Sequence, residues 1–490
     1  MVPPPGTAAG GSAAVRGPSA AAPTGLRVAV VGSGPAGLYT AEALVKQAGA
    51  AGRGEVEVDV LERLPTPYGL VRYGVAPDHP SIRSIADYLR RVLEDPRVRF
   101  LGGLCFGRDL TREHLLTCYD AVVYATGAPG DRRLRIPGEE LPGSAAAAEF
   151  VRWYCGHPDA GPAGFDLGVE SVAVIGTGNV ALDVARVLAR PAVDFRATDV
   201  PEPVLAALAA SRVRRIHLVG RRGPAQARFT TRELRALGAL PAGEVVVDRA
   251  DLDLDAFDPT GESTRLARED RRVRDNLAVL AQWADRVPEG RPRRVTVGFW
   301  QQPVEILGTD RVRALRLERT GLDASGRLVG TGRYRTLPVQ LVLRSVGYRS
   351  APLPGVPFDE RRAVVPNDEG RVLGPDGRAR PGEYVVGWLK RGPTGVIGSN
   401  KSDAAQTVRA LLADPAPDGA AAPRGAGARP RLTELLAERG VRPVSYADWL
   451  AIDRREQALA AELGRGARVK LSGWAALDGA HGHGPAAGGR

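Results

Sequence analysis

The sequence contains little cysteine and no long apolar run. Its three cysteines, Cys105, Cys118 and Cys155, stand far apart and form no CxxC pair, which argues against a disulfide framework, a zinc site and a dithiol redox centre. No stretch reaches the ~18 consecutive apolar residues that a membrane helix needs. We therefore expect a protein of the reducing cytoplasm, with no metal site and no membrane association.

Lysine is also scarce. It occurs only at Lys46, Lys390, Lys401 and Lys470, so the remaining 63 of the 67 basic residues are arginines, and the formal net charge is +11. A positive surface favours an acidic partner or an anionic cofactor. We find no nucleic-acid recognition module, so we expect no nucleic-acid partner. There is also no nucleophile-elbow sequence of the kind that α/β-hydrolases carry.

The length allows two or three domains, because 490 residues exceed the usual size of one. Residues 1–24 and 476–490 are rich in small residues, and we expect disordered tails there. Residues 415–430 have low complexity and are predicted to form a linker.

The most informative stretch is Arg27–Glu62. A valine-rich strand meets a glycine turn, a helical pattern follows, and a second valine-rich strand ends at Glu62. This is the dinucleotide-binding fingerprint. Gly32 permits the tight turn, Gly34 lets the backbone approach a pyrophosphate, and Gly37 lets helix and strand pack closely. The helix start attracts phosphate, and Glu62 can accept hydrogen bonds from a ribose.

The same pattern returns about 140 residues later, with one difference. A strand at Val172–Ile175 is followed by GTGNVA, a helical segment and a strand at Arg215–Val219. Arg221 and Arg222 stand where Glu62 stands in the first unit. A carboxylate favours a free ribose 2′-hydroxyl, whereas arginines suit a 2′-phosphate. The first unit is therefore predicted to bind a dinucleotide without a 2′-phosphate, and the second NADP.

Two nucleotide units without other catalytic apparatus favour a flavin that exchanges electrons with NADP. We predict strands at Val98–Phe106 and Ala121–Ala125, the second closing with Ala125-Thr126-Gly127. This small-residue turn and the later segment Gly387–Ile397 supply further contacts for a large ligand such as FAD.

Four longer motifs resemble the adrenodoxin-reductase type of ferredoxin–NADP reductase. They are YGLVRYGVAPDHP at Tyr68–Pro80, VIGTGNVALDVAR at Val174–Arg186, GRRGPAQARFTTRELR at Gly220–Arg235 and GWLKRGPTGVIGSNKSDA at Gly387–Ala404. The similarity runs in order from about Leu26 to Gly473. It therefore covers nearly the whole chain.

The resemblance implies an α/β fold of two Rossmann-like dinucleotide-binding domains of the three-layer β/β/α type. An FAD domain would comprise residues 25–128 and 346–475, and an NADP domain at 129–345 would be inserted into it. The implied activity passes a hydride from NADPH to FAD and then single electrons to a ferredoxin-type iron–sulfur protein. Such partners are typically acidic, and the enzyme would be a monomer or weak dimer.

The resemblance also implies site residues, matched motif by motif. The residues along FAD would be Ser33, Gly34, Ala36, Glu62, Leu70, Cys105 (through its backbone), Trp388, Gly395, Val396 and Ile397. The residues holding NADP would be Arg132, Asn179, Val180, Ala181, Leu182, Arg221, Arg222, Glu233 and Gly395. His79 and Glu233 would lie at the flavin–nicotinamide junction, where they would orient the nicotinamide and relay protons.

Three alternatives remain at this point. A pyridine-nucleotide disulfide reductase needs a redox dithiol, and no CxxC is present. A glutamate-synthase-type reductase subunit shares the two-nucleotide layout, but that class carries N-terminal cysteine clusters. A non-catalytic NADP- or FAD-binding protein would share the fingerprints without the redox activity.

Overall fold

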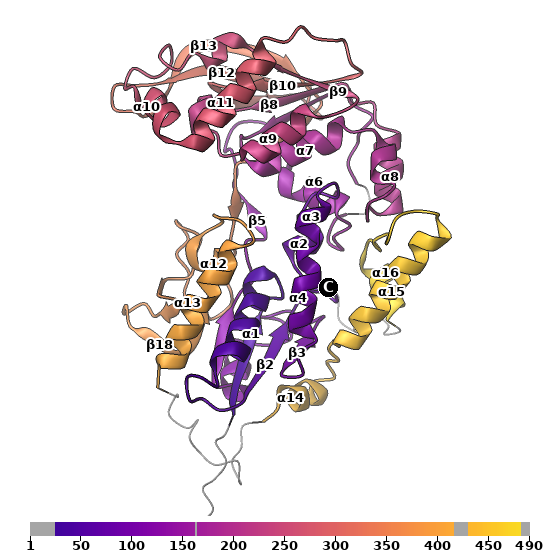
Figure 1. Ribbon diagram of the computed structural model, residues 1–490, viewed down its shortest axis with the longest axis vertical. Coiled ribbons are helices and arrows are strands. Elements are labelled where there is room, and N and C mark those ends of the chain that lie inside the picture. Colours follow the sequence, from indigo (N-terminus) through magenta and orange to yellow (C-terminus); the bar gives the residue numbers. More distant parts are fainter. Residues whose placement is uncertain (1–24, 162–163, 416–429, 482–490) are drawn as a thin grey trace, which may run out of the picture.

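The structure is a computed structural model that describes residues 25–161, 164–415 and 430–481. The tail predicted at 1–24, residues 416–429 of the predicted linker and residues 482–490 lie outside the described residues. The chain forms two lobes, each built on one large sheet, with the C-terminal helices lying along one side (Figure 1).

The first domain is built on a seven-stranded sheet with the order β16-β17-β18-β4-β1-β2-β3. The four strands β4, β1, β2 and β3 pair in parallel. The strands of this sheet are β1 (Leu26–Val31), β2 (Val56–Leu61), β3 (Val98–Leu101), β4 (Ala121–Tyr124), β16 (Asn367–Asp368), β17 (Arg371–Leu373) and β18 (Ala379–Val385).

Helices cover both faces of this sheet. One apolar cluster joins alternate residues of β1 and β2 to α1, α4, α13 and α15, and a second joins the opposite face to α5 and α14. The helices of this domain are α1 (Pro35–Gln47), α2 (Leu70–Tyr73), α3 (Pro80–Arg83), α4 (Ile85–Leu93), α5 (Arg112–Cys118), α12 (Trp388–Arg391), α13 (Ser399–Ala413), α14 (Leu432–Glu438), α15 (Tyr446–Glu462) and α16 (Trp474–Ala480).

The second domain has a six-stranded sheet with the order β6-β14-β7-β8-β10-β9. Helices pack on one face, and the antiparallel sheet β11-β12-β13 packs on the other, which gives the three layers expected. Its strands are β6 (Ser144–Ala146), β7 (Ser171–Ile175), β8 (Arg215–Val219), β9 (Gly243–Val247), β10 (Arg293–Gly298), β11 (Gln301–Leu307), β12 (Ala314–Leu322), β13 (Leu328–Pro338) and β14 (Leu341–Arg344). Its helices are α6 (Ala147–Tyr154), α7 (Asn179–Ala189), α8 (Glu202–Ala209), α9 (Thr231–Gly238), α10 (Glu262–Glu269) and α11 (Arg271–Ala284).

The two main sheets repeat one arrangement. The run β4-β1-β2-β3 in the first domain corresponds to β14-β7-β8-β10 in the second, and each glycine turn follows the central strand. A Cβ on Gly32 would lie 2.5 Å from the carbonyl oxygen of Ala125, and one on Gly176 would lie 2.2 Å from that of Ser345. Both glycines also have positive φ, so each turn can pass the neighbouring strand end only without a side chain.

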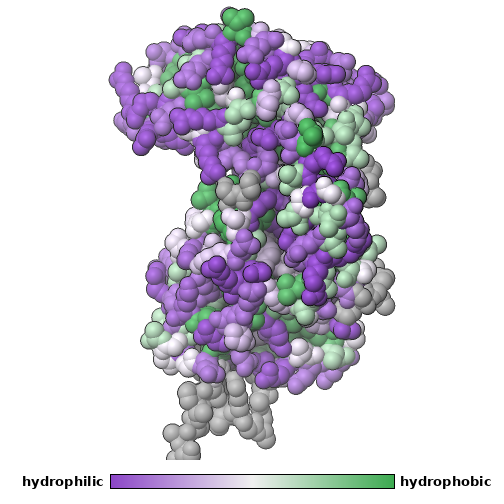
Figure 2. Space-filling view, turned by 45° about the vertical axis from the view of Figure 1, so that its right-hand side comes forward, coloured by the Kyte–Doolittle hydropathy of each residue, from purple (hydrophilic) through white to green (hydrophobic). Residues whose placement is uncertain are grey.

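The chain crosses between the domains twice, at neighbouring places. Strands β5 (Gly130–Asp131) and β15 (Tyr348–Arg349) pair antiparallel where the lobes meet (Figure 1). The second domain is thus inserted into the first, as the resemblance implies. The numerical boundaries 128/129 and 345/346 stay predictions. Figure 2 shows the surface hollowed on one side between the lobes.

Two local expectations are wrong. The strand predicted at Val98–Phe106 ends at Leu101, because Gly103 has a φ of +75° and Gly102 pairs instead with Val444. The C-terminal tail predicted from residue 476 is helical as far as Ala480, because Leu477 is fully buried in the first domain's core.

Candidate active site

The start of α1 has the features of a phosphate seat. Gly34 precedes the helix without a side-chain cap. A Cβ on Gly69 would lie 2.9 Å from the Cα of Gly34, and one on Gly387 would lie 2.6 Å from Ala36. Three separate segments therefore bring bare backbone to this turn. Close approach of backbone, together with free helical N–H groups, fits a pyrophosphate.

Glu62 lies directly beside the same turn. Its carboxylate accepts hydrogen bonds from the Ser33 N–H at 3.0 Å and the Ser33 hydroxyl at 2.7 Å. It also accepts one from the Leu64 N–H at 3.0 Å. The side chain is thus held at the end of β2, where a ribose would lie. Ser33 itself is fully buried, so its side chain orients Glu62.

Apolar residues gather on the segments around this seat. Leu70 opens α2 with 37% of its surface exposed, and Val396 is 67% exposed. Trp388 opens α12 and donates from its indole N–H to the carbonyl of Thr394 at 3.1 Å, which closes the loop that carries Gly395 and Ile397. Its ring lies 5.3 Å from that of Tyr348, on the domain crossing. Exposed apolar side chains beside a polar turn fit the cover of a planar ring.

Cys105 is the expected FAD residue that fits least well. It follows β3 rather than lying in a strand, and its N–H already donates to the Asp109 carboxylate at 2.8 Å. Its carbonyl accepts from Arg108 and Asp109. Its backbone is therefore engaged in a local turn.

The start of α7 repeats the phosphate seat in the second domain. Gly178 precedes the helix without a side-chain cap, and a Cβ on it would meet nothing within 4 Å. The Asn179 side chain accepts from the Thr230 N–H at 2.8 Å, which fixes the segment before α9 to the helix start. Val180 is half-buried, whereas Ala181 and Leu182 are fully buried. The last two can offer only backbone to a ligand.

Arginines without protein partners surround this second seat. Arg221 and Arg222, just past β8, are exposed, and neither side chain pairs with any residue in the described part of the chain. Arg132 is likewise exposed, and its N–H donates to the carbonyl of Gly347 on the crossing at 2.9 Å. Arg228, which sequence reasoning missed, is exposed, and its N–H donates to Thr177 in the glycine turn at 2.8 Å. Its position two residues before the Thr230 that meets Asn179 becomes visible only in the fold.

His79 and Glu233 come together from different domains. His79 lies between α2 and α3, Glu233 lies in the first turn of α9, and their Nε2 and Oε2 atoms are 2.9 Å apart. Asp183 on α7 lies 3.1 Å from the same histidine nitrogen. Sequence reasoning missed Asp183, Arg186 and Asp78, which complete the cluster. The spacing Asp183-x-x-Arg186 places both on one face of a helix, which was the available signal.

The cluster shifts the proton affinity of its members. Burial lowers the pKa of His79, but the hydrogen bonds to Asp183 and Glu233 outweigh it and raise that pKa to about 9. The hydrogen bond from His79 lowers the pKa of Glu233 against the opposing effect of burial. The imidazole is therefore protonated and the carboxylate ionised at neutral pH.

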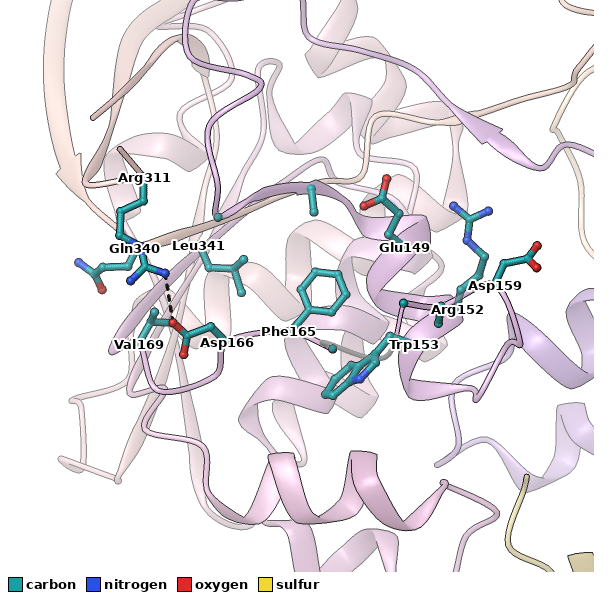
Figure 3. A pocket seen from close by; sticks show the side chains of 15 residues that line it. Glu149, Arg152, Trp153, Asp159, Phe165, Asp166, Val169, Arg311, Gln340 and Leu341 are labelled. Carbon is teal, nitrogen blue, oxygen red and sulfur yellow. Dashed lines mark hydrogen bonds and ion pairs between the residues drawn. The ribbon is translucent and has the colours of Figure 1, made fainter. Parts of the chain in front are cut away.

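Two other features do not make sites. His79, Asp183 and Glu233 could offer ligand atoms within 4.8 Å of one another. The Arg186 guanidinium already contacts all three, so a metal ion would face its charge, and we assign no metal there. A cavity of about 560 Å³ between α6 and β14 contains no predicted site residue, and an Arg311–Asp166 ion pair lies at its edge (Figure 3).

Among the described residues, no helix is both long enough and apolar enough to span a membrane. The family model for pyridine nucleotide-disulphide oxidoreductases matches residues 26–235, which hold both glycine turns. Because the chain contains no CxxC, this match reflects the nucleotide-binding fold rather than a dithiol centre.

Relatives cover almost the whole chain. NADPH-ferredoxin reductase FprA of Mycobacterium leprae is 44% identical over 92% of this chain and 97% of its own length. The mitochondrial NADPH:adrenodoxin oxidoreductase of Arabidopsis thaliana is 39% identical over 93% of this chain and 95% of its own length. The solved structure of Mycobacterium tuberculosis FprA in complex with NADPH has a TM-score of 0.86 at 43% identity, covering 94% of this chain and all of that one. The chain therefore belongs to the family of NADPH-ferredoxin and NADPH:adrenodoxin reductases.

Proposed function

We propose that this chain is an NADPH–ferredoxin reductase that takes electrons from NADPH through FAD to a ferredoxin- or adrenodoxin-type iron–sulfur protein. The observation that carries the proposal is the contrast between the two nucleotide seats, in a chain whose relatives match over their full length. One seat ends in Glu62 and the other in Arg221 and Arg222.

FAD belongs in the first domain and NADP(H) in the second. The turn at Gly34 and Ala36 holds the FAD pyrophosphate, and Glu62 accepts the hydroxyls of the adenosine ribose. Leu70, Trp388 and the segment Gly395–Ile397 cover the flavin and keep water from it. When bound, FAD supplies the redox chemistry, because it accepts a hydride and releases electrons singly.

The second seat selects the nucleotide. Arg221 and Arg222 bind the 2′-phosphate through their planar forks, and Arg132 reaches a phosphate from the domain crossing. The backbone of Asn179, Val180, Ala181 and Leu182 holds the pyrophosphate at the helix start. Free guanidinium groups support this assignment, since an arginine already paired with a carboxylate would have to exchange that partner for phosphate.

His79 and Glu233 lie at the junction of the two nucleotides. Hydride transfer requires no acid or base at the reacting carbon, so alignment contributes most of the rate. Glu233 accepts a hydrogen bond from the nicotinamide carboxamide, and His79 holds Glu233 in place. The protonated imidazole also keeps a proton available near the flavin as its charge changes.

We further propose that the protein acts in the cytoplasm, away from membranes, as a monomer or weak dimer, and that its iron–sulfur partner is acidic. The net charge of +11 supports an acidic partner, because complementary charge speeds association.

The test is a visible spectrum of the purified protein, followed by cytochrome c reduction with NADPH or NADH and with or without a ferredoxin. We expect flavin absorbance, preference for NADPH and stimulation by ferredoxin. A colourless protein would contradict the flavin assignment, and a preference for NADH would contradict the role of the two arginines.

A further inference from the structure

Arg186 is a buried guanidinium in the middle of the ionic cluster. It lies on α7 with 1% of its side chain exposed. Its Nε and Nη2 atoms donate to the two Asp78 carboxylate oxygens at 2.5 and 3.0 Å. Nη2 also donates to Asp183 at 2.8 Å, and Nη1 donates to Glu233 at 3.4 Å. One planar group thus organises three carboxylates.

These contacts cross the domain boundary. Asp78 precedes His79 in the first domain, between α2 and α3, whereas Arg186 and Glu233 belong to α7 and α9 of the second. Burial would raise the pKa of Asp78, but its hydrogen bond to Arg186 outweighs this effect and lowers the pKa. Asp78 is therefore an ionised carboxylate, buried at the interface and held by an arginine of the other domain. A second guanidinium, Arg190, lies 3.3 Å from the same carboxylate.

The charges of the cluster balance only when His79 is protonated. The groups that face His79 or its partners are Asp78 on its own segment, Asp183, Arg186 and Arg190 on α7, Glu233 and Arg232 on α9, and Tyr154 on α6. The three carboxylates exceed the two guanidinium groups of α7 by one negative charge. Protonated His79 supplies the missing positive charge in a region where an unbalanced charge is costly.

We propose that Arg186 is a positioning residue that fixes Glu233 and Asp183 against His79 and ties this group to the first domain through Asp78. The proposal rests on the proposed function, in which His79 and Glu233 lie beside the nicotinamide. Arg186 makes no contact with the nucleotides in this scheme. It sets the alignment of the two domains' catalytic groups, and only its five-donor fork can reach Asp78 and Glu233 together.

The first test measures the titration of His79 directly, without any turnover. The protein has six histidines, so NMR of histidine-labelled protein can assign His79 as the signal lost in His79→Gln. Removing a neighbouring positive charge with Arg186→Met should raise the pKa of His79 by about one unit, whereas removing a negative charge with Asp78→Asn should lower it. A variant that merely loosens the fold would move the pKa toward its ordinary value in both cases.

The second test measures flavin reduction by stopped flow. Arg186→Met and Asp78→Asn should lower the limiting rate at saturating NADPH at least tenfold, while the NADPH concentration for half-maximal rate changes less than about twofold. Arg186→Lys keeps the charge but loses the fork, so the pKa of His79 should stay near that of the wild type and the rate should recover only in part.

Arg319→Met is the matched control. It breaks another ion pair of the second domain, between Arg319 and the buried Asp251 at 2.6 Å, and it should lower thermal stability without changing the His79 titration. The proposal is overturned if Arg186→Met leaves the His79 pKa unchanged or lowered, or leaves the limiting rate unchanged. If Arg186→Met does not fold, Asp78→Asn decides by the same two readouts. A wild type that NADPH does not reduce would contradict the proposed function, and the NMR titration would still decide the role of Arg186.

Discussion

The choice of NADPH over NADH is predicted to depend on Arg221 and Arg222. Both side chains are exposed at the end of β8 and make no ion pair within the described residues. A hydrogen bond to a charged group contributes about 1.5–3 kcal/mol. Exposure favours the lower end of this range, because water screens the charges. Replacing either arginine by alanine should therefore reduce kcat/KM for NADPH about tenfold.

The double variant should lose less than the product of the two single effects. Neighbouring arginines share one phosphate, so their contributions are coupled rather than additive. NADH lacks the 2′-phosphate, and its kcat/KM should stay within about twofold of the wild-type value. The assay is flavin reduction or ferredoxin-dependent cytochrome c reduction, measured with both nucleotides.

Arg215→Ala is the control for general loss of positive charge. Arg215 opens the same strand, and its side chain pairs with Glu170 at 3.2 Å on the surface. This variant should leave both nucleotides unaffected. Equal losses for NADPH and NADH in the Arg221 and Arg222 variants would refute the reasoning, as would an equal loss in Arg215→Ala.

Three further predictions follow from the site. His79→Gln should slow flavin reduction by NADPH while FAD stays bound; unchanged stopped-flow reduction would refute this role. The same histidine has its pKa raised to about 9, so its stabilising effect should be complete below pH 6.5 and lost as the pH rises through 9; urea unfolding of wild type and His79→Gln at several pH values checks the sign. Gly69→Ala places a Cβ 2.9 Å from the Cα of Gly34 at a φ of +49°, so the purified variant should carry less flavin per chain than the wild type.

Much of the fold could be predicted because glycine turns constrain the backbone so strongly. The strand at Arg215–Val219 has the predicted bounds, and the two fingerprints identify the central strands of both sheets. The boundary error at Phe106 arose because apolar content continues after Leu101 while Gly103 redirects the chain. A propensity argument sees the apolar residues and misses the tertiary pairing of Gly102 with Val444.

The site was predictable where a residue belongs to a motif, and less so where it acts through space. Glu62, Arg221 and Arg222 follow from their places at strand ends. Asp78 and Arg186 are separated by 108 positions, and each looks like an ordinary surface charge in a sequence rich in arginine. Only the inserted topology brings them together, so no local pattern could have paired them.

The most direct test of the account is an anaerobic titration of the purified flavoprotein, followed by its visible absorbance. We predict that one equivalent of NADPH bleaches the flavin, that NADH does so far more slowly, and that oxidised ferredoxin then restores the absorbance. A flavin that NADPH does not bleach, or one that ferredoxin does not reoxidise, would contradict the assignment of this chain as an NADPH–ferredoxin reductase.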